Sequence, residues 1–231
     1  MEIILASGSP RRRELLTKAQ VDFKVLSVDI DETQQVDEMP KDYIERMVKA
    51  KAAAAVEQLN KTHTLNKPAE PMIILTADTI GVLADGQTVL VKPTDRDHAY
   101  RMWQQMSDNT HEVWTAVQAT KVQPVSKPSQ DGTIHDSRVL NNDSTVLNCI
   151  VFEVVEQQQL TERTDVTFIP LTVQMMSDYW NSGEPVDKAG GYGIQGLGAA
   201  WVERINGSYT SVVGLPLAQT LALIERVRTS K

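Results

Sequence analysis

The chain begins MEIILASGSPRRRELLTK over residues 1–18, and this stretch carries the clearest signals of fold class. Residues 2–6 are a short apolar run typical of a buried strand, and a Ser-Gly-Ser-Pro turn follows it. Ser9 is a suitable helix N-cap and Pro10 a suitable first helical residue, so a helix is expected over residues 11–18. A strand, a tight turn and a helix start aim backbone N–H groups at whatever lies above the turn, and that geometry suits an anion.

The arginines after this turn strengthen the expectation of an anion site. Three consecutive arginines fall in the first helical turn, where each opposes the positive end of the helix dipole by roughly 0.3–1 kcal/mol. A bound anion would reverse the sign of that effect, and Ser7 and Ser9 could donate from their hydroxyls. A phosphate-bearing ligand is the natural candidate, and a solvated basic turn is the alternative.

Helices and strands alternate along the rest of the chain without an internal repeat. Strands are expected at residues 23–28, 72–79, 89–91, 111–125, 146–155 and 164–170, with two more around 199–213, and helices at 40–59, 95–106, 172–183 and 216–228. This alternation predicts one α/β domain with a mixed sheet over residues 1–231. Residues 126–145 are polar and rich in turn formers, which predicts an inserted flexible hairpin tip.

Length and composition narrow the class of protein further. The 231 residues, 41% of them apolar, are enough to bury a core without disulfide or metal staples. The net charge of -7 provides no overall basic field for a polyanion, so no nucleic-acid partner is expected. One cysteine excludes an internal disulfide, and the four histidines show no zinc spacing. Without a signal peptide or an apolar run of about 18 residues, we expect a cytoplasmic protein with no membrane partner.

Carboxylates follow two of the expected strands. Asp29, Asp31 and Glu32 come after the second strand, and Asp78 ends the third. Carboxylates at strand ends often line the ligand crevice of α/β proteins, and Mg²⁺ is commonly held by one or two of them with substrate phosphates. Taken singly, the first three are more typical of turns and caps. Asp78 follows the four apolar residues 72–75 with only Thr76 and Ala77 between, so its carboxylate is expected to be part-buried and costly unless it is used or paired.

Lysines and a glycine-rich segment complete the candidate groups. Lys51 lies on the helix expected at 40–59 and favours a solvated position, whereas Lys92 precedes a proline that fixes its direction. Residues 191–196, GYGIQG, match G-x-G-x-x-G, but no buried strand precedes them and no helix follows, so a dinucleotide site is rejected. The dense glycines of 183–198 indicate backbone passing close to a ligand or a neighbouring strand. The Gln195 amide both donates and accepts, which suits the edge of a nucleobase.

Taken together, these motifs resemble the Maf family of nucleoside triphosphate pyrophosphatases. The matching stretches are ASGSPRR at 6–12, ELL at 14–16, DE at 31–32, KA at 51–52, ADT at 77–79, KP at 92–93, GEP at 183–185, DKAG at 187–190, YGIQG at 192–196, NGSY at 206–209 and VVGLPL at 212–217. They cover nearly the whole chain in the order of the family. The chain departs from the family near residues 120–155, where the connection is usually much shorter, and this leaves the role of the insertion open.

The resemblance implies an elongated mixed-sheet fold with two lobes around a cleft, similar to the inosine triphosphatases, in a protein that is typically a homodimer. It implies hydrolysis of a nucleoside triphosphate to the monophosphate and pyrophosphate with a divalent metal, Mg²⁺ or Mn²⁺. Asp78 matches the general base of the family, and Glu32 matches a metal-binding position. Substrate-binding positions are matched by Ser7, Arg11, Arg12, Glu32, Lys51, Thr79, Lys92, Asp187, Lys188 and Gln195.

The resemblance also implies a substrate preference. Arg12, Thr79 and Gln195 match positions associated with base selectivity, and together they are similar to the branch acting on dTTP and UTP and on modified pyrimidine nucleotides. One alternative is the branch that prefers 7-methyl-GTP. Another is a regulatory binding protein of cell division or septum formation. Such a protein would tolerate Asp78→Asn, need no metal, and use residues 126–145 as its natural partner contact.

Overall fold

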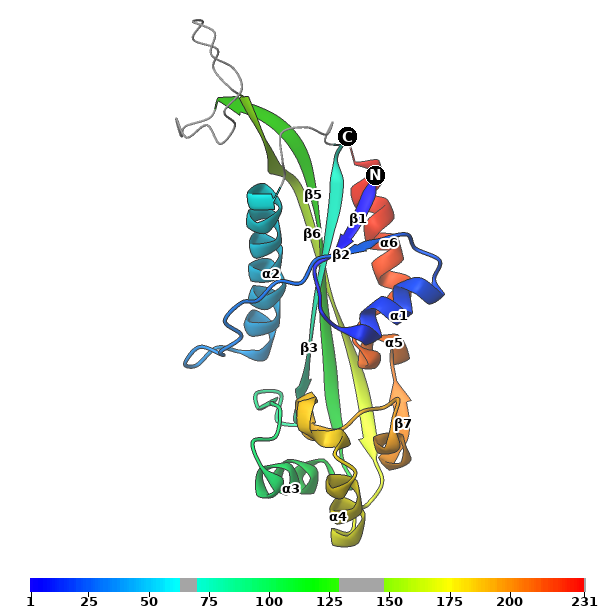
Figure 1. Cartoon of the computed structure of the whole chain (residues 1–231). Coiled ribbons are helices and arrows are strands. Elements are labelled where there is room, and N and C mark those ends of the chain that lie inside the picture. The colour runs from blue at the N-terminus through cyan, green and yellow to red at the C-terminus, as the bar shows by residue number, and fades with distance from the viewer. Residues whose placement is uncertain (63–69, 129–147, 231) are drawn as a thin grey trace, which may run out of the picture.

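The computed structural model describes residues 1–62, 70–128 and 148–230 (Figure 1). The strands are β1 (Glu2–Leu5), β2 (Lys24–Val25), β3 (Met72–Val82), β4 (Val89–Leu90), β5 (Thr110–Pro128), β6 (Asn148–Phe168) and β7 (Val202–Asn206). The α-helices are α1 (Pro10–Lys18), α2 (Pro40–Thr62), α3 (Arg96–Met106), α4 (Val173–Asn181), α5 (Tyr209–Val213) and α6 (Leu217–Thr229). The 3₁₀ helices are η1 (Glu184–Asp187), η2 (Ala189–Gly191) and η3 (Leu197–Trp201). Of the predicted insertion, residues 126–128 end β5, and the remainder lies outside the described residues.

The sheet is mixed and long, as the sequence predicts. Its strand order is β2-β1-β3-β5-β6-β7, with β4 paired to β3 beside that path. β1 runs parallel to both β2 and β3, and the other pairs are antiparallel. β3, β5 and β6 extend along the molecule, with α1, α2 and α6 around one end and α3 and α4 at the other (Figure 1). The predicted elongated α/β fold with two lobes is confirmed.

Helices cover both faces of the sheet in the first lobe, and the alternation of β3 separates the two cores. Ile73 and Leu75 pack in a core with residues of α1 and α6, whereas Ile74 packs on the opposite face with Ala55 of α2. Successive residues of a strand point to opposite faces, so this uninterrupted apolar run serves both layers. The second lobe has its own core, which is rich in aromatic rings and includes Trp103.

Local capping signals set the helix starts. The Ser9 hydroxyl accepts from the backbone of α1, whose first residue is Pro10. Asp95 caps α3 and Thr172 caps α4 in the same way, so the N-termini of these helices agree with the predicted positions to within a residue. None of the described helices is long and apolar enough to cross a membrane.

One strand is longer than the sequence predicts. The separate strands expected at 146–155 and 164–170 are parts of the single strand β6. The intervening residues 156–163 are polar except for Leu160 and show no hydrophobic alternation, but they pair with β5, for example Glu156 with Lys121. An antiparallel ribbon that faces water on one side accepts polar residues, so the pairing partner decides the structure here.

Only one of the two strands expected around 199–213 is present. The segment forms η3, the strand β7 and the short helix α5. Ser208 caps α5 by accepting from the backbone of Ser211, which places the apolar pair Val212-Val213 near the end of a helix. Short apolar runs do not distinguish a strand from a buried helical turn, and the cap decides between them.

Candidate active site

The cavity forms where β3 loses its neighbouring strand. β1 pairs with residues 72–75 and β4 with residues 81–82, so no strand in the described part pairs with that edge over residues 76–80. Asp78 and Thr79 lie in this gap. Their side chains point to opposite faces of the strand, yet both line the same cavity of about 600 Å³ because the edge between them is uncovered.

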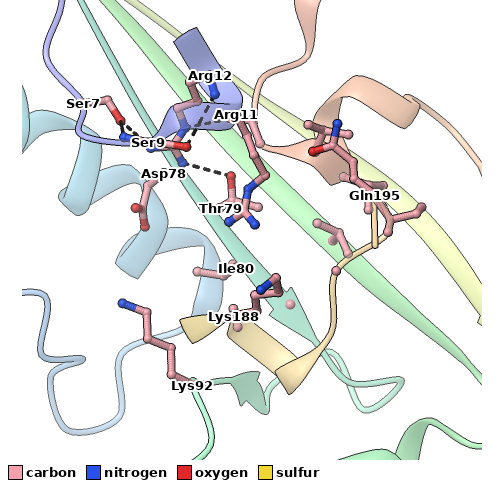
Figure 2. Close-up of a pocket in the computed structure, with 18 of the residues that line it drawn as sticks. Ser7, Ser9, Arg11, Arg12, Asp78, Thr79, Ile80, Lys92, Lys188 and Gln195 are labelled. Carbon is pink, nitrogen blue, oxygen red and sulfur yellow. Dashed lines mark hydrogen bonds between the residues drawn. The ribbon is translucent and has the colours of Figure 1, made fainter. Parts of the chain in front are cut away.

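The structure brings together every predicted site residue whose side chain it describes. The residues lining the cavity include Ser7, Arg11, Arg12, Glu32, Lys51, Asp78, Thr79, Lys92, Lys188 and Gln195. The turn before α1 lies on one side, Lys92 and Lys188 lie on the opposite side, and Gln195 approaches from a separate segment (Figure 2). Asp187 is the last residue of η1, and its side chain lies outside the described part of the structure.

A shared ammonium group joins the two predicted carboxylates. Lys51 Nζ lies 2.6 Å from Asp78 Oδ1 and 2.7 Å from Glu32 Oε1. Lys51 is only 9% exposed because α2 packs against β3, so this lysine does not occupy the solvated position that its helix favours. Burial opposes ionisation of Glu32, but the hydrogen bond from Lys51 and the nearby charges of Lys92 and Arg12 bring its pKa below the ordinary value.

Each nitrogen of the Arg12 guanidinium donates one hydrogen bond to the protein, which uses three of its five N–H groups. Its Nε donates to Gly214 O at 2.8 Å, Nη1 to Ser7 Oγ at 3.1 Å and Nη2 to Thr79 Oγ1 at 3.2 Å. Burial lowers the pKa of Arg12, an effect that the charge of Asp78 opposes, and an arginine in such a setting stays protonated. Arg12 therefore ties the turn before α1, the strand β3 and the end of α5 into one unit.

Ser7 presents a hydrogen-bond donor to the cavity. Its Oγ accepts from the Ser9 backbone N–H at 3.2 Å as well as from Arg12. A hydroxyl has two acceptor lone pairs and one hydrogen, so both lone pairs are used and only the O–H remains. Phosphate oxygens accept hydrogen bonds, so a group that only donates suits them.

Two cations in the cavity have no ion-pair partner within 4 Å among the described residues. Arg11 and Lys92 form no ion pair with any residue in the described ranges, and they line the cavity on its two sides (Figure 2). Lys188 lies near Lys92, and its Nζ donates to the backbone oxygen of Glu184 at 2.6 Å. These positive groups and the Ser7 hydroxyl form a surface complementary to an oligophosphate.

Sequence reasoning did not assign Glu184 to the site, although it lines the cavity and holds the glycine-rich segment in place. Its Oε1 accepts from Tyr179 Oη at 2.7 Å and its Oε2 from Leu197 N at 2.8 Å. A Cβ at Gly196 would overlap both carboxylate oxygens, so the close approach that the glycines indicate is to this side chain. Burial opposes ionisation of Glu184, but the Leu197 N–H and the Tyr179 hydroxyl lower its pKa. The one signal in the sequence that could have identified Glu184 is its position between Gly183 and Pro185.

The segment held by Glu184 carries Gln195. The Gln195 side chain is exposed, and no residue of the described part hydrogen-bonds its amide. Gln195 lies apart from Arg12 and Thr79 in the cavity (Figure 2). Its free amide is therefore available to a ligand, whereas three N–H groups of Arg12 already donate to other residues.

The fold and the cavity define a class of protein. It is a two-lobed α/β protein whose cleft combines cations that form no ion pair with the described residues and a carboxylate that is bonded to a buried lysine. The family model described as Maf-like protein matches residues 2–227, and the chain belongs to the Maf family.

Similar proteins cover nearly the whole chain. It is 62% identical to a protein of Psychrobacter cryohalolentis named dTTP/UTP pyrophosphatase, over 98% of this chain and 97% of that one. A protein of the same name from Psychrobacter arcticus is 60% identical, over 98% of this chain and 95% of its own. Another from Escherichia coli O157:H7 is 40% identical, over 96% of this chain and 91% of its own.

Proposed function

We propose that this protein hydrolyses dTTP and UTP, together with modified pyrimidine nucleotides, to the nucleoside monophosphate and pyrophosphate. Removing such nucleotides would prevent their misincorporation. The observation that carries the proposal is the cluster of Asp78, Lys51 and Glu32 beside the oligophosphate surface, in a chain 62% identical to a dTTP/UTP pyrophosphatase. The names of these relatives favour this activity over the 7-methyl-GTP preference.

In the proposed reaction Asp78 is the general base. Its Oδ1 is held by Lys51, which leaves Oδ2 to take a proton from water as the water oxygen bonds to the α-phosphorus. The bond from the α-phosphorus to the oxygen bridging to the β-phosphorus breaks, and its electron pair leaves with pyrophosphate. The Ser7 hydroxyl, Arg11 and Lys92 would stabilise the charge that develops on the phosphate oxygens.

The residues present fit a divalent cation, Mg²⁺ or Mn²⁺. Glu32 would hold it, because the side chain of Glu32 is 51% exposed toward the cavity and carboxylate oxygens are the ligands that Mg²⁺ prefers. The described residues contain no cluster of three acidic, histidine or cysteine side chains, so substrate phosphate oxygens would complete the coordination. When bound, the cation would neutralise charge on the triphosphate.

Base selectivity is proposed for Arg12, Thr79 and Gln195, which approach the cavity from different segments. Asp187 and Lys188 are proposed as further substrate contacts at the end of η1. Of these groups, Thr79 and Gln195 offer side-chain atoms to a base, and Arg12 holds Thr79 in position. The pyrimidine preference would then depend on two hydrogen-bonding groups that the fold brings together from distant parts of the chain.

The proposal is tested by pyrophosphate release from dTTP, UTP, CTP, GTP, ITP and 7-methyl-GTP with Mg²⁺ or Mn²⁺, each with an EDTA control. We expect metal-dependent release with the monophosphate as co-product, fastest for dTTP and UTP. Fast turnover of 7-methyl-GTP would keep the chemistry and overturn the base preference. No release from any nucleotide would overturn the activity and favour the binding-protein alternative.

We also propose that the protein is a cytoplasmic homodimer. β6 pairs with β7 only over residues 165–168, so within the described residues the remaining outer edge of β6 has no partner strand. Val154 and Val155 on β6 are each 44% exposed. Light scattering on the eluting protein is expected to give twice the 25.7 kDa of the chain, and the mass of one chain would contradict the proposal.

A further inference from the structure

The hydroxyl of Thr79 belongs to a chain of hydrogen bonds whose two ends have fixed direction. Thr79 Oγ1 lies 3.2 Å from Arg12 Nη2 and 2.9 Å from Thr115 Oγ1, and Thr115 Oγ1 lies 2.8 Å from Ser211 O. A guanidinium only donates hydrogen bonds and a backbone carbonyl only accepts them. The directions of the two hydroxyl groups between them are therefore determined.

The proton positions follow by elimination. The Thr115 hydroxyl has one hydrogen, and only that hydrogen can bond the Ser211 carbonyl. Thr115 must then accept from Thr79, so the hydrogen of Thr79 is used. One lone pair of Thr79 accepts from Arg12, which leaves a single lone pair and no hydrogen for a ligand.

Burial prevents water from relaxing this arrangement. Thr115 and Ser211 are both 0% exposed, so reversing the Thr115 hydroxyl would leave the Ser211 carbonyl without this partner in a dry site. The two hydroxyls that accept from Arg12 therefore differ in what they can offer to a ligand. Ser7 has both lone pairs occupied and offers only its hydrogen, whereas Thr79 offers only a lone pair.

We propose that Thr115 is a positioning residue that determines base specificity, by taking the Thr79 proton and making Thr79 an acceptor toward the substrate. An acceptor there selects a base that carries an N–H donor, such as the imino group at ring N3 of uracil and thymine. It disfavours cytosine, whose ring N3 carries a lone pair. The inference rests on the proposed function, because it assumes that Thr79 faces the base of a nucleotide.

Substitution of Thr115 tests the direction of the hydrogen bonds that join Thr79, Thr115 and the Ser211 carbonyl. Thr115→Val keeps the shape of the side chain but cannot accept, which frees the Thr79 hydrogen to turn toward the ligand. We expect the ratio of kcat/KM for UTP over CTP to fall about tenfold, the equivalent of one hydrogen bond, mainly through a lower KM for CTP. Thr115→Ser keeps the hydroxyl and is expected to retain the ratio of the unmodified protein. An unchanged ratio in Thr115→Val would overturn the proposal.

A matched variant separates this effect from a general loss of stability. Thr110 of β5 and Thr167 of the neighbouring strand β6 join their hydroxyls at 2.8 Å, and neither residue lines the cavity. Thr110→Val removes a similar threonine pair and is expected to lower the Tm while leaving the UTP/CTP ratio unchanged. A shift of that ratio in Thr110→Val equal to the shift in Thr115→Val would also overturn the proposal.

Modified substrates test the inference from the ligand side. We expect the unmodified protein to be about tenfold less efficient on 3-methyluridine triphosphate, which lacks the imino hydrogen, than on 5-methyluridine triphosphate, which keeps it. Equal efficiency would overturn the proposal. Calorimetric Kd values for UMP and CMP give the same comparison without the hydrolysis step. We expect the unmodified protein to bind UMP about tenfold more tightly than CMP, and Thr115→Val to remove this difference. Absent hydrolysis with this pattern of binding would overturn the proposed function alone, whereas hydrolysis with an unchanged ratio would overturn the role of Thr115 alone.

Discussion

The two walls of the cavity are built in different ways. The strand wall consists of residues 7–12, Lys51 and the pair Asp78-Thr79, which lie on or beside a regular strand and two helices. The glycine wall consists of residues 183–198, which form 3₁₀ turns rather than strands or α-helices. The strand wall is joined by side-chain bonds among its own cavity residues. The backbone of the glycine wall is held by the Glu184 carboxylate and by side chains of the second lobe, Tyr179 and Trp103.

The two walls hold their functional groups by different means, and we expect them to affect different steps of the reaction. Charged groups in the strand wall are held by core packing, since α2 and β3 share buried apolar residues on either side of Lys51. In the glycine wall, Glu184 anchors the backbone to Tyr179, a member of the aromatic core of the second lobe. We therefore expect changes in the strand wall to affect the chemical step most, and changes in the glycine wall to affect substrate binding and selectivity.

The largest effect is expected from Asp78→Asn. Loss of the general base should lower kcat by about 10²–10⁴, while Lys51 keeps its bond to Glu32 and the fold survives. Steady-state kinetics with UTP measure the loss, and circular dichroism checks the fold. Asp97→Asn, an exposed change in the first turn of α3, serves as the matched control. Near-normal turnover in Asp78→Asn would remove this residue from the role of base.

The next largest effect is expected from Lys51→Met. The change leaves two carboxylates facing each other without their shared cation, which should reduce the free energy of unfolding by about 3 kcal/mol, the lower end for a broken buried pair. The pKa of Glu32 should rise because the hydrogen bond from Lys51 is lost. Denaturant unfolding measures the first effect. Lys49→Met, on the exposed face of the same helix, should change stability little, and equal losses in both variants would contradict the shared-cation role.

A smaller effect is expected from Glu184→Gln in the glycine wall. The amide replaces charge-assisted bonds to Tyr179 and Leu197, so we expect a loss of about 1 kcal/mol and a raised KM with kcat nearly unchanged. Because the folded pKa of Glu184 is lowered, its stabilising contribution is present above the unfolded value of about 4.3 and disappears as pH falls below it. The difference in Tm between the two proteins should therefore shrink below about pH 4. If kcat falls and KM stays unchanged, Glu184 affects the chemical step, as we expect of residues in the strand wall, and the assignment to substrate binding is wrong.

The smallest effect is expected from Gln195→Ala, which removes an exposed side chain that no described residue bonds. Losing one hydrogen bond to a base should reduce the UTP/GTP ratio of kcat/KM about three- to tenfold and leave the Tm unchanged. The same nucleotide panel measures the ratio. If the ratio stays constant while the Tm falls, Gln195 acts on the loop and the proposed contact with the base is wrong.

Much of the strand wall could be predicted from the sequence because its signals are local. A cap at Ser9, a proline at the next position and the apolar run 72–75 shortly before Asp78 are readable over a few residues. The role of residues 156–163 could not be predicted in this way, since their strand structure comes from pairing with β5. Short-range sequence patterns identify a helix or strand only where the residues of that helix or strand are enough to determine its structure.

The α/β class, the starts of α1, α3 and α4 and most of the residues that meet in the cavity follow from the sequence alone. Only the tertiary structure decided how those residues act on one another. It buried Lys51 between two carboxylates, laid the glycine loop on Glu184 and connected Thr79 through Thr115 to Ser211. These contacts join segments far apart in the chain, and their charges and hydrogen-bond directions depend on burial, which exists only once the sheet and its helices have packed together.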